Sequence, residues 1–380
     1  MASTTDHLVH GMGKALETPT WPIITASEAE EIVAQFPGAG QFECLSWHSP
    51  RPFSAATLVH TDRGEFVLKR HHHDVRSPGV LAAEHAFMAH LQSAGMAVPE
   101  VMTASLGKGA IAHDGWTYEL HRKAAGADLY GDRPSWTPFL NLDHAFAAGA
   151  ALARLHLAAR GFAGAERARC PLIASFTIVP APDQLAAARA YVEARPAVAR
   201  FLADKPWEAE LQRLFSALGQ GLAERLEVQP PLWTHNDWHP SNLLWSAEGT
   251  VRTVFDFGLA TRTCAVHDLA TAIERTAIAW LDLDHPNQDL SVDVGAAVQL
   301  LDGYRTILPL SHDDIETIVR LLPLVHVEFA LSEVHYFAGI LNDRAQADLA
   351  WQGYAIDHAD WFLSPAGQDF QHQLRRQAKV

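Results

Sequence analysis

The stretch from residue 233 to residue 258 constrains the fold of this chain more than any other part of its sequence. It reads WTHNDWHPSNLLWSAEGTVRTVFDFG, and the short apolar runs on either side of its Ala-Glu-Gly turn predict a β-hairpin. His235, Asp237 and Asn242 form an H-x-D-x4-N pattern at the start of this hairpin, and Asp256-Phe257-Gly258 follows its end. A fold that contains the hairpin therefore holds polar side chains at both of its ends.

The residue types in this pattern are those that phosphoryl transfer requires. A carboxylate at the position of Asp237 can orient and deprotonate an attacking hydroxyl, while Asn242 and Asp256 offer the oxygen ligands that Mg²⁺ prefers. An H-x-D triplet occurs by chance in many chains, but a D-F-G triplet that starts 14 positions after the asparagine is much harder to produce by accident. We therefore predict that the protein transfers a phosphate, with Asp237 as the catalytic residue.

The sequence upstream of this stretch mixes strand and helix patterns. Residues 55–60 and 65–69 predict two strands joined by a turn over 61–64. Residues 80–94 carry apolar residues at helical spacing, and residues 115–121 predict a further strand. This part of the chain is therefore expected to form an antiparallel sheet with at least one helix.

From residue 123 onward the periodicity is mainly helical. Helices are predicted over 142–160, 183–194, 206–227, 267–282, 293–306, 313–341 and 345–363. We therefore predict an α+β fold with a mobile lead-in over 1–24, a small nucleotide-binding N-lobe over 25–122 and a large, mostly α-helical C-lobe over 123–380. The C-lobe would carry the catalytic and acceptor-binding residues.

Lys69 and Glu84 supply candidates for the nucleotide site. Lys69 ends a strand-like FVLK segment, and Glu84 lies 15 positions further on, in the first long predicted helix. In protein kinases a strand lysine binds the α- and β-phosphates while a helix glutamate fixes its ammonium group. Each residue alone is better explained as a surface charge, but their order relative to the downstream motif favours the functional interpretation.

The composition disfavours several classes of protein. A formal net charge of −15 opposes nonspecific binding to nucleic acid, and it fits either a cationic substrate or simply an acidic surface. No apolar stretch reaches the about 18 residues of a membrane span, and the N-terminus lacks the pattern of a secretory signal. Three well-separated cysteines fit a reducing compartment, so we expect a cytoplasmic protein. The sequence leaves the oligomeric state open.

Histidine is frequent, with 22 residues, but its pattern does not favour a catalytic transition-metal site. The three consecutive histidines over 71–73 lie in a predicted strand, so their side chains cannot all face one ion. His235 and His239 are four positions apart, which suits zinc only on a helix, and Pro240 favours a loop there. We expect His235 to be structural and to hold backbone beneath the loop.

Taken together, these residues resemble the aminoglycoside phosphotransferase and choline kinase superfamily, small-molecule relatives of the protein kinases, over roughly residues 45–365. The resemblance is carried by Lys69, Glu84, the stretch 118–126, Leu152 to His156, His235 to Asn242, Asp256 to Gly258, and His267 to Ala270. It implies a bilobal, protein-kinase-like fold, with ATP (or GTP as an alternative) and Mg²⁺ as cofactors. The helical tail over 328–337 looks most like members that act on homoserine, hydroxylysine and related hydroxyl compounds.

The resemblance also implies roles for individual residues of the nucleotide site. Lys69 would bind phosphates, fixed by Glu84, and a hinge around 119–126, which includes Glu119 and His121, would present backbone to adenine. The segment 47–55, where a phosphate-covering loop should lie, departs from the family because it has no glycine. Backbone amides near Ser54 would have to cover the phosphates instead.

The acceptor is expected to be a small molecule with a hydroxyl group, such as an aminoglycoside-like antibiotic, an amino alcohol or a hydroxy amino acid. Candidate pocket residues are Trp238, Glu328, Glu333 and Tyr336. Their carboxylates would hold an amine if the acceptor is cationic, although each of the four alone is as well explained by ordinary packing. Asn236 stands where many relatives have glycine, and we expect it to shape the same pocket.

Two other functions remain open from the sequence: a stress-response-type Ser/Thr protein kinase and a catalytically idle nucleotide-binding regulator. Only about ten residues separate Asp256-Phe257-Gly258 from Asp268, which leaves no room for the long activation loop of protein kinases. Idle relatives usually lose the lysine, the base or a metal ligand, and all of these positions are filled here. Both observations favour an active enzyme with a small acceptor.

Overall fold

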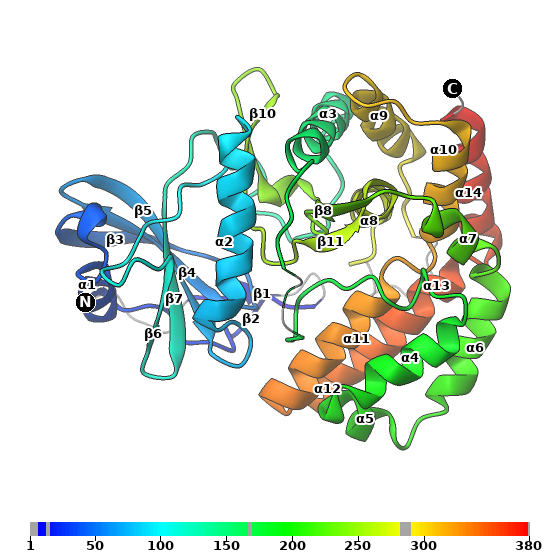
Figure 1. Ribbon diagram of the computed structural model, residues 1–380, viewed down its shortest axis with the longest axis horizontal. Coiled ribbons are helices and arrows are strands. Elements are labelled where there is room, and N and C mark those ends of the chain that lie inside the picture. The colour runs from blue at the N-terminus through cyan, green and yellow to red at the C-terminus, as the bar shows by residue number, and fades with distance from the viewer. Residues whose placement is uncertain (1–6, 13–15, 166, 168, 282–289, 379–380) are drawn as a thin grey trace.

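The chain folds into two unequal lobes, as the sequence predicts. The computed structural model describes residues 7–12, 16–165, 167, 169–281 and 290–378. Figure 1 shows a smaller lobe built on a sheet and a larger lobe built mainly of helices. We call them the N-lobe and the C-lobe, and their architecture confirms the α+β, protein-kinase-like fold class.

The N-lobe is built on a five-stranded antiparallel sheet with the strand order β3-β4-β5-β7-β6. Its strands are β3 (Phe42–His48), β4 (Ala55–Thr61), β5 (Gly64–His72), β6 (Ala110–His113) and β7 (Trp116–Arg122). The predicted hairpin is confirmed, because β4 and β5 pair from Ala55↔Arg70 to Thr61↔Gly64. This register places Lys69 opposite Ala56 on one side and opposite Glu119 on the other.

Two helices accompany this sheet, and one of them faces the other lobe. Helix α1 (Ala26–Val33) buries Ile32 and Val33 in the same cluster as Phe66 of the sheet. Helix α2 (Pro78–Ser93) stands between the sheet and the C-lobe in Figure 1. Its Phe87 ring lies 5.4 Å from the ring of Trp233 and 5.9 Å from that of Phe257. Helix α2 therefore couples the N-lobe to the segments that carry the candidate catalytic residues.

The C-lobe surrounds two short antiparallel strand pairs with helices. The pairs are β8 (Pro231–Thr234) with β11 (Thr261–Cys264), and β9 (Leu243–Trp245) with β10 (Val251–Val254). The α-helices are α3 (Leu142–Ala158), α4 (Gln184–Glu193), α5 (Pro196–Leu202), α6 (Trp207–Leu218), α7 (Leu222–Glu227), α8 (Ala265–Ala277), α9 (Val294–Arg305), α10 (His312–Leu321), α11 (Val327–Tyr336), α12 (Arg344–Asp348), α13 (His358–Trp361) and α14 (Pro365–Gln377). Phe337–Leu341 and Leu349–Asp357 are π-helical. The β9–β10 pair confirms the hairpin predicted in the 233–258 stretch.

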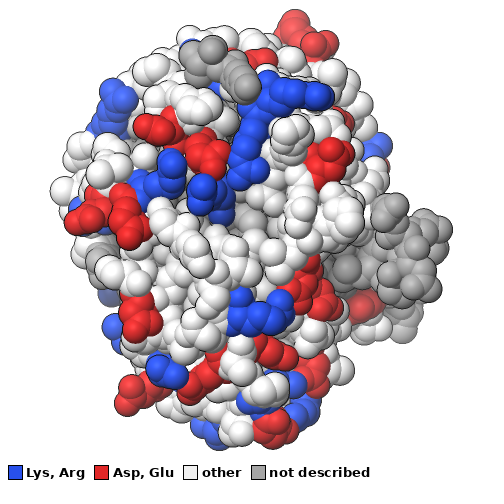
Figure 2. Space-filling view, turned by 90° about the vertical axis from the view of Figure 1, so that its right-hand side faces the viewer, with Lys and Arg blue, Asp and Glu red and all other residues white. Residues whose placement is uncertain are grey.

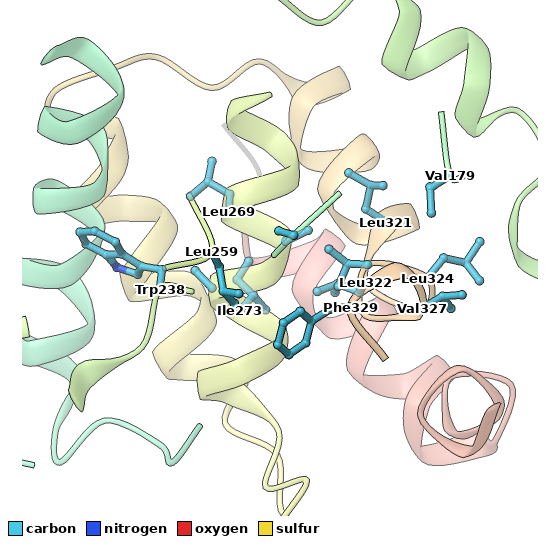
Figure 3. Packing of buried hydrophobic residues seen from close by; sticks show 14 of the residues in the cluster. Val179, Trp238, Leu259, Leu269, Ile273, Leu321, Leu322, Leu324, Val327 and Phe329 are labelled. Atoms are coloured by element: carbon cyan, nitrogen blue, oxygen red, sulfur yellow. The ribbon is translucent and has the colours of Figure 1, made fainter. Parts of the chain in front are cut away.

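The core of the C-lobe is centred on helix α8. Figure 3 shows Leu269 and Ile273 of α8 in one buried cluster with Phe329 of α11 and with Trp238. All four side chains are at most 7% exposed. The loop after β8 is therefore anchored in the interior of the lobe, which gives the site that follows a rigid base.

Two of the predicted helices are each divided in the structure. The 206–227 pattern becomes α6 and α7, because Gly221 adopts a left-handed φ of +72° and the chain turns there. The 313–341 pattern becomes α10 and α11, because Pro323 has no N–H group and cannot continue a helix. Apolar periodicity passes through both breaks, which is why it did not reveal them.

The described part of the N-terminal segment, where the sequence predicts a mobile lead-in over 1–24, contacts both lobes, and on the N-lobe the Trp21 ring lies 5.4 Å from that of Trp116. Its strands β1 (Val9–His10) and β2 (Leu16–Glu17) pair with each other. The Trp21 indole donates to the Tyr336 hydroxyl at 2.9 Å, and the Tyr354 hydroxyl donates to the Met12 carbonyl. Aromatic and apolar residues in a largely polar segment form these contacts. Residues 1–6 and 13–15 lie outside the described part of the chain.

The surface shows mixed charge on the face drawn in Figure 2. Lys and Arg side chains are interspersed there with Asp and Glu side chains. Such a face lacks the concentrated positive charge that attracts a phosphate backbone. Among the described helices, none is both long enough and apolar enough to cross a membrane.

Candidate active site

The loop that carries Asp237 is held from beneath by Asp268 at the start of α8. The carboxylate of Asp268 accepts the backbone N–H groups of His235 and Asn236 at 2.9 and 2.8 Å, and His156 of α3 lies 3.0 Å from it. Asn236 has a φ of +59°, a left-handed conformation that glycine and asparagine adopt most readily. Asparagine is therefore compatible with the turn that the backbone makes here. The Asn236 side chain bonds to Thr234 and Leu259 and does not line the cavity described below.

His235 joins the two ends of the catalytic stretch. Its Nε2 lies 3.0 Å from the carbonyl oxygen of Phe255, and its Nδ1 accepts the N–H of Asp237 at 3.2 Å. Burial lowers the pKa of His235, which favours the neutral ring that this donor and acceptor pattern needs. The structure thus shows His235 holding backbone, as the sequence predicts.

The Asp237 carboxylate sits between three polar side chains. Asn242 Nδ2 donates to Asp237 Oδ2 at 3.0 Å, Arg275 Nη1 donates to Asp237 Oδ1, and His239 Nε2 lies 3.4 Å from the same oxygen. Burial lowers the pKa of Arg275 to about 9, so its guanidinium is still charged at neutral pH. Sequence reasoning missed Arg275, which lies beside Glu274 on α8 and meets Asp237 only through the tertiary fold.

Lys69 and Asp256 form an ion pair across the two lobes. Lys69 Nζ lies 3.2 Å from Asp256 Oδ1, and 42% of the Asp256 side chain is exposed to the cavity side. Burial raises the pKa of Asp256, but the adjacent ammonium group outweighs it and lowers the pKa to about 2. Asp256 is therefore a charged carboxylate with oxygen surface left for a ligand. Its φ of +60° turns the chain sharply at this point.

The predicted Lys69–Glu84 pair is absent, and Arg167 explains why. Arg167 Nη2 donates to Glu84 Oε2 at 3.1 Å, while its Nη1 donates to the carbonyl oxygens of Gly258 and Ala260 at 2.8 and 3.0 Å. Glu84 is 2% exposed and satisfied by this guanidinium. It is therefore tied through Arg167 to the segment after Asp256, and Lys69 pairs with Asp256 instead.

The expectation that Glu119 and His121 present backbone to adenine is wrong. Both lie inside β7, where Glu119 pairs with Lys69 and Ala110, and His121 pairs with Val67. Their backbone groups therefore serve the sheet. The Glu119 side chain is buried beside its cross-strand partner Lys69. Its carboxylate accepts hydrogen bonds from the rings of three histidines: His71 (3.0 Å), His85 (2.7 Å) and His121 (3.0 Å). The carboxylate of Glu119, and not its backbone, contributes to the site.

The segment predicted to cover the phosphates follows β3 and contains an arginine that sequence reasoning missed. Arg51 and Ser54 both line the cavity. Arg51 Nη1 donates to the carbonyl of Arg133 at 2.8 Å, and the carboxylates of Asp128 and Asp256 oppose the lowering of its pKa by burial. A guanidinium thus stands close to Asp256 in a loop that has no glycine, where it can neutralise phosphate charge.

Both aromatic residues predicted for the acceptor pocket have other roles. Trp238 is fully buried in the C-lobe core, where Figure 3 shows it, and its ring packs edge-on against the ring of His235. Tyr336 is 1% exposed, accepts from Trp21 and packs against Phe53 at 5.4 Å. Neither lines the cavity, because both side chains are used in packing.

Glu328 does not line the cavity either. Its carboxylate accepts the backbone N–H groups of Thr177, Ile178 and Val179, together with the hydroxyls of Ser175 and Thr177. It therefore fixes the loop before α4 and has no capacity left for an acceptor. The predicted acceptor role of Glu328 is wrong for this physical reason.

Glu333 is the one predicted acceptor residue that does line the cavity. It is fully buried, and neither of its carboxylate oxygens has a hydrogen-bond partner among the described residues. Burial raises its pKa, and the neighbouring His326 and Arg275 oppose that shift. An unpaired buried carboxylate of this kind is suited to a ligand that brings hydrogen-bond donors.

One cavity between the lobes brings most of these side chains together. Its lining includes Ser54, Lys69, Glu84, Glu119, Asp237, Asn242, Asp256 and Glu333. Trp136, Phe329 and Tyr354 add an apolar wall near Glu333. The cavity therefore has a charged end, lined by several carboxylates and a lysine. This end is continuous with a deeper end, where a single carboxylate lies among aromatic rings.

These features define an enzyme that transfers phosphate, and comparison with known families agrees. The model of the phosphotransferase enzyme family matches residues 53–309. The chain belongs to this family. Comparison with curated proteins found no match to this sequence.

Solved structures of similar fold are distant in sequence. An aminoglycoside phosphotransferase from Alicyclobacillus acidocaldarius is 17% identical, with a TM-score of 0.51 over 91% of this chain and 95% of that one. An amicoumacin kinase in complex with AMP-PNP and Ca²⁺ is 15% identical, with a TM-score of 0.55 over 92% and 93%. A microcompartment-associated aminopropanol kinase is 18% identical, with a TM-score of 0.55 over 90% and 99%. At these identities the likeness establishes the fold.

Proposed function

We propose that this phosphotransferase moves the γ-phosphate of ATP to a hydroxyl group of a small molecule bound in the cavity between its lobes. The observation that carries the proposal is the shared cavity: Asp237, Asn242, Asp256 and Lys69 line it together. Transfer of this kind needs a nucleotide held by its phosphates and an acceptor hydroxyl placed in line. The cavity offers residues suited to both tasks.

Each side chain has a role that its surroundings support. Asp237, held by Asn242 and Arg275, would orient the hydroxyl and accept its proton. Lys69, which reaches Asp256 across the lobes, would bind the phosphates. Because Arg275 already fixes one oxygen of Asp237, the carboxylate keeps a set orientation and need not reorganise when the acceptor binds.

The oxygen donors of Asn242 and Asp256 fit a magnesium ion. Both line the cavity, and Mg²⁺ typically takes one or two protein oxygens together with substrate phosphates. When bound, the ion would neutralise charge that develops on the transferred group. GTP is an alternative to ATP. The backbone groups of Glu119 and His121 pair with the neighbouring strands and therefore do not distinguish one base from the other.

The acceptor is proposed to carry an amine as well as a hydroxyl. Glu333, the unpaired carboxylate at the deep end of the cavity, would pair with the cation, and Trp136 and Phe329 would contact its apolar part. Names of the similar solved structures, which include an aminopropanol kinase and an aminoglycoside phosphotransferase, support this class of acceptor. The protein-kinase alternative is disfavoured because β11 and α8 follow Gly258 without a long loop.

A panel of acceptors with labelled ATP and Mg²⁺ tests this function. We expect label to appear in small-molecule products and ADP release to depend on the acceptor. Matched pairs, each an amino alcohol with the diol of the same length, should differ in kcat/KM by at least about tenfold in favour of the amine, because a hydrogen bond to a charged group contributes about 1.5–3 kcal/mol. Label in the protein fraction, or turnover that no acceptor changes, would contradict the proposal.

Substitution of Arg51 by alanine tests the glycine-free phosphate loop. We expect KM for ATP to rise about 10–100-fold with a smaller change in kcat, because a charge-assisted contact to phosphate is lost. Steady-state kinetics with saturating acceptor measure both constants. Arg63→Ala is the matched control, since Arg63 also donates to a backbone carbonyl in the N-lobe (Pro37, 3.2 Å) but does not line the cavity. An equal effect of both variants would assign Arg51 to folding only.

A further inference from the structure

Glu274, His326 and His358 form a buried cluster behind the candidate active site. Glu274 lies in α8, His326 directly precedes α11 and His358 begins α13. Each residue is at most 4% exposed. One potential ligand atom from each lies within 4.8 Å of the others. Three helices that are distant in sequence thus bring two imidazoles and one carboxylate to a single point.

Five of the six polar side-chain atoms of this cluster are buried without a hydrogen-bond partner among the described residues. These atoms are both carboxylate oxygens of Glu274, both ring nitrogens of His358 and Nε2 of His326. A buried carboxylate without a partner is strongly unfavourable, and protein interiors normally pair such groups or use them to bind a metal. The guanidinium beside it in sequence, Arg275, donates to Asp237. Glu274 therefore has no lysine or arginine partner among the described ion pairs, and a bound cation would supply that charge.

The separations between its atoms suit an ion better than hydrogen bonds. His358 Nδ1 lies 3.4 Å from Glu274 Oε1, and His326 Nδ1 lies 3.8 Å from Glu274 Oε2. Zinc–ligand bonds of about 2.0–2.1 Å in a tetrahedron place neighbouring ligand atoms roughly 3.3 Å apart. These two separations, each to a different oxygen of Glu274, are close to the spacing that a shared ion would impose, and one ligand atom from each of the three residues lies within 4.8 Å of the others.

A second cluster of the same residue types shows the contrast. Around Glu119, the rings of His71, His85 and His121 lie at 2.7–3.0 Å from the carboxylate oxygens and form hydrogen bonds. Protons bridge that cluster, and its carboxylate is satisfied. The cluster at Glu274 contains the same residue types, but its described atoms form no such hydrogen bonds. Residue composition alone therefore does not explain the geometry of the Glu274 cluster.

The surroundings of the Glu274 cluster orient its rings. Trp280 stacks on His358 with ring centroids 3.7 Å apart and donates to the Glu274 carbonyl at 2.9 Å. Glu333 Oε2 lies 3.8 Å from His326 Nε2, the nitrogen that faces away from Glu274. That distance is too long for a hydrogen bond, so Glu333 stays available for the acceptor, and the stacking of Trp280 is the contact that orients the ring of His358.

We propose that Glu274, His326 and His358 bind a zinc-class divalent cation. Two imidazoles and a carboxylate suit Zn²⁺, whereas Mg²⁺ prefers sites made of oxygen. The ion would join α8, α11 and α13 behind the catalytic loop. Because Arg275 follows Glu274 on α8, the same ion would fix the backbone from which Arg275 reaches Asp237. This site is separate from the proposed magnesium ligands Asn242 and Asp256.

Metal analysis of protein purified without a polyhistidine tag tests the site directly. We expect about one zinc per chain, its removal by dipicolinate with a fall in Tm, and its restoration by added Zn²⁺, since a ligand of the folded state raises Tm. Cobalt added to the stripped protein should give the visible absorption of tetrahedral Co²⁺. Wild-type protein that holds no zinc, shows no cobalt spectrum and has a Tm unaffected by Zn²⁺ would overturn the proposal.

Variants then locate the ion. His358→Ala and Glu274→Gln should each lose the bound metal and the cobalt spectrum, while His358→Cys should retain cobalt and add a sulfur-to-metal charge-transfer band. His335→Ala is the matched control, because His335 lies in α11 and also has an unpartnered Nδ1 but stands outside the cluster. Circular dichroism checks that each variant is folded. Metal binding unchanged in folded His358→Ala would place the ion elsewhere and overturn the assignment.

Discussion

Replacement of Asp237 by asparagine is expected to lower kcat by about 10²–10⁴-fold, the contribution usually made by a positioned acid–base group. The asparagine keeps the shape of the side chain and can still accept from Arg275, but it can no longer take the proton of the acceptor hydroxyl. The affinity for a nonhydrolysable ATP analogue should change by no more than a few-fold, because Lys69 and Asp256 are untouched. Steady-state kinetics and calorimetric titration measure the two effects separately.

A matched variant shows whether the loss of activity is only a general effect of removing a paired carboxylate on folding. Asp302 is also a carboxylate that pairs with an arginine (Arg305, 3.0 Å), but it lies outside the cavity. Asp302→Asn should therefore keep wild-type kcat. If Asp237→Asn retained near-wild-type activity on a true acceptor, the assignment of the base would be incorrect. If it lost nucleotide affinity together with kcat, Asp237 would act through the nucleotide site.

The elements that the sequence predicted well are those that local chemistry determines. The hairpin from Ala55 to Arg70 has alternation on both strands and a glycine, Gly64, with φ +120° at its turn. The fold class followed from the order of such elements. The breaks at Gly221 and Pro323 were missed because apolar residues resume on the far side of each break, so that the periodicity hardly changes.

The site was predictable where one contiguous motif carries it and less so where distant segments meet. Asp237, Asn242 and Asp256 come from 20 consecutive residues, and the structure places all three on one cavity. Arg275 and Arg167 reach the site from other elements, and each depends on a tertiary contact. The Glu84 prediction was wrong about its partner for this reason: a guanidinium from a distant loop competes for the same carboxylate.

The same limit applies to the acceptor pocket. Four residues were predicted from a helical segment and one loop, but a helix presents its residues to several neighbours at once. Glu328 faces the loop before α4, whereas Glu333, little more than one turn further along α11, faces the cavity. Which face meets which neighbour is set by the packing of α8 and the π-helical segment after α12. No local pattern encodes that choice.

Replacement of Asp256 by alanine is expected to lower kcat/KM by on the order of 10³-fold and to abolish the response to magnesium. A metal that stabilises charge in the transition state contributes several kcal/mol, and each 1.36 kcal/mol is tenfold in rate. In wild-type protein, Mg²⁺ should tighten the binding of a nonhydrolysable ATP analogue. In the variant, the affinity should be the same with and without the ion, as measured by calorimetric titration.

A double-mutant comparison with Asn242 separates a metal role from loss of the Lys69 pair. If Asn242 and Asp256 hold one ion, the Asn242→Ala, Asp256→Ala double variant should be hardly slower than the slower single variant, because the ion is lost only once. If Asp256 serves only to neutralise Lys69, the two effects should add, since Asn242 has no contact with Lys69 among the described hydrogen bonds. Additive losses together with an intact magnesium response would therefore exclude Asp256 as a metal ligand. In that case Asp256 would act only as the charge partner of Lys69, independently of Asn242.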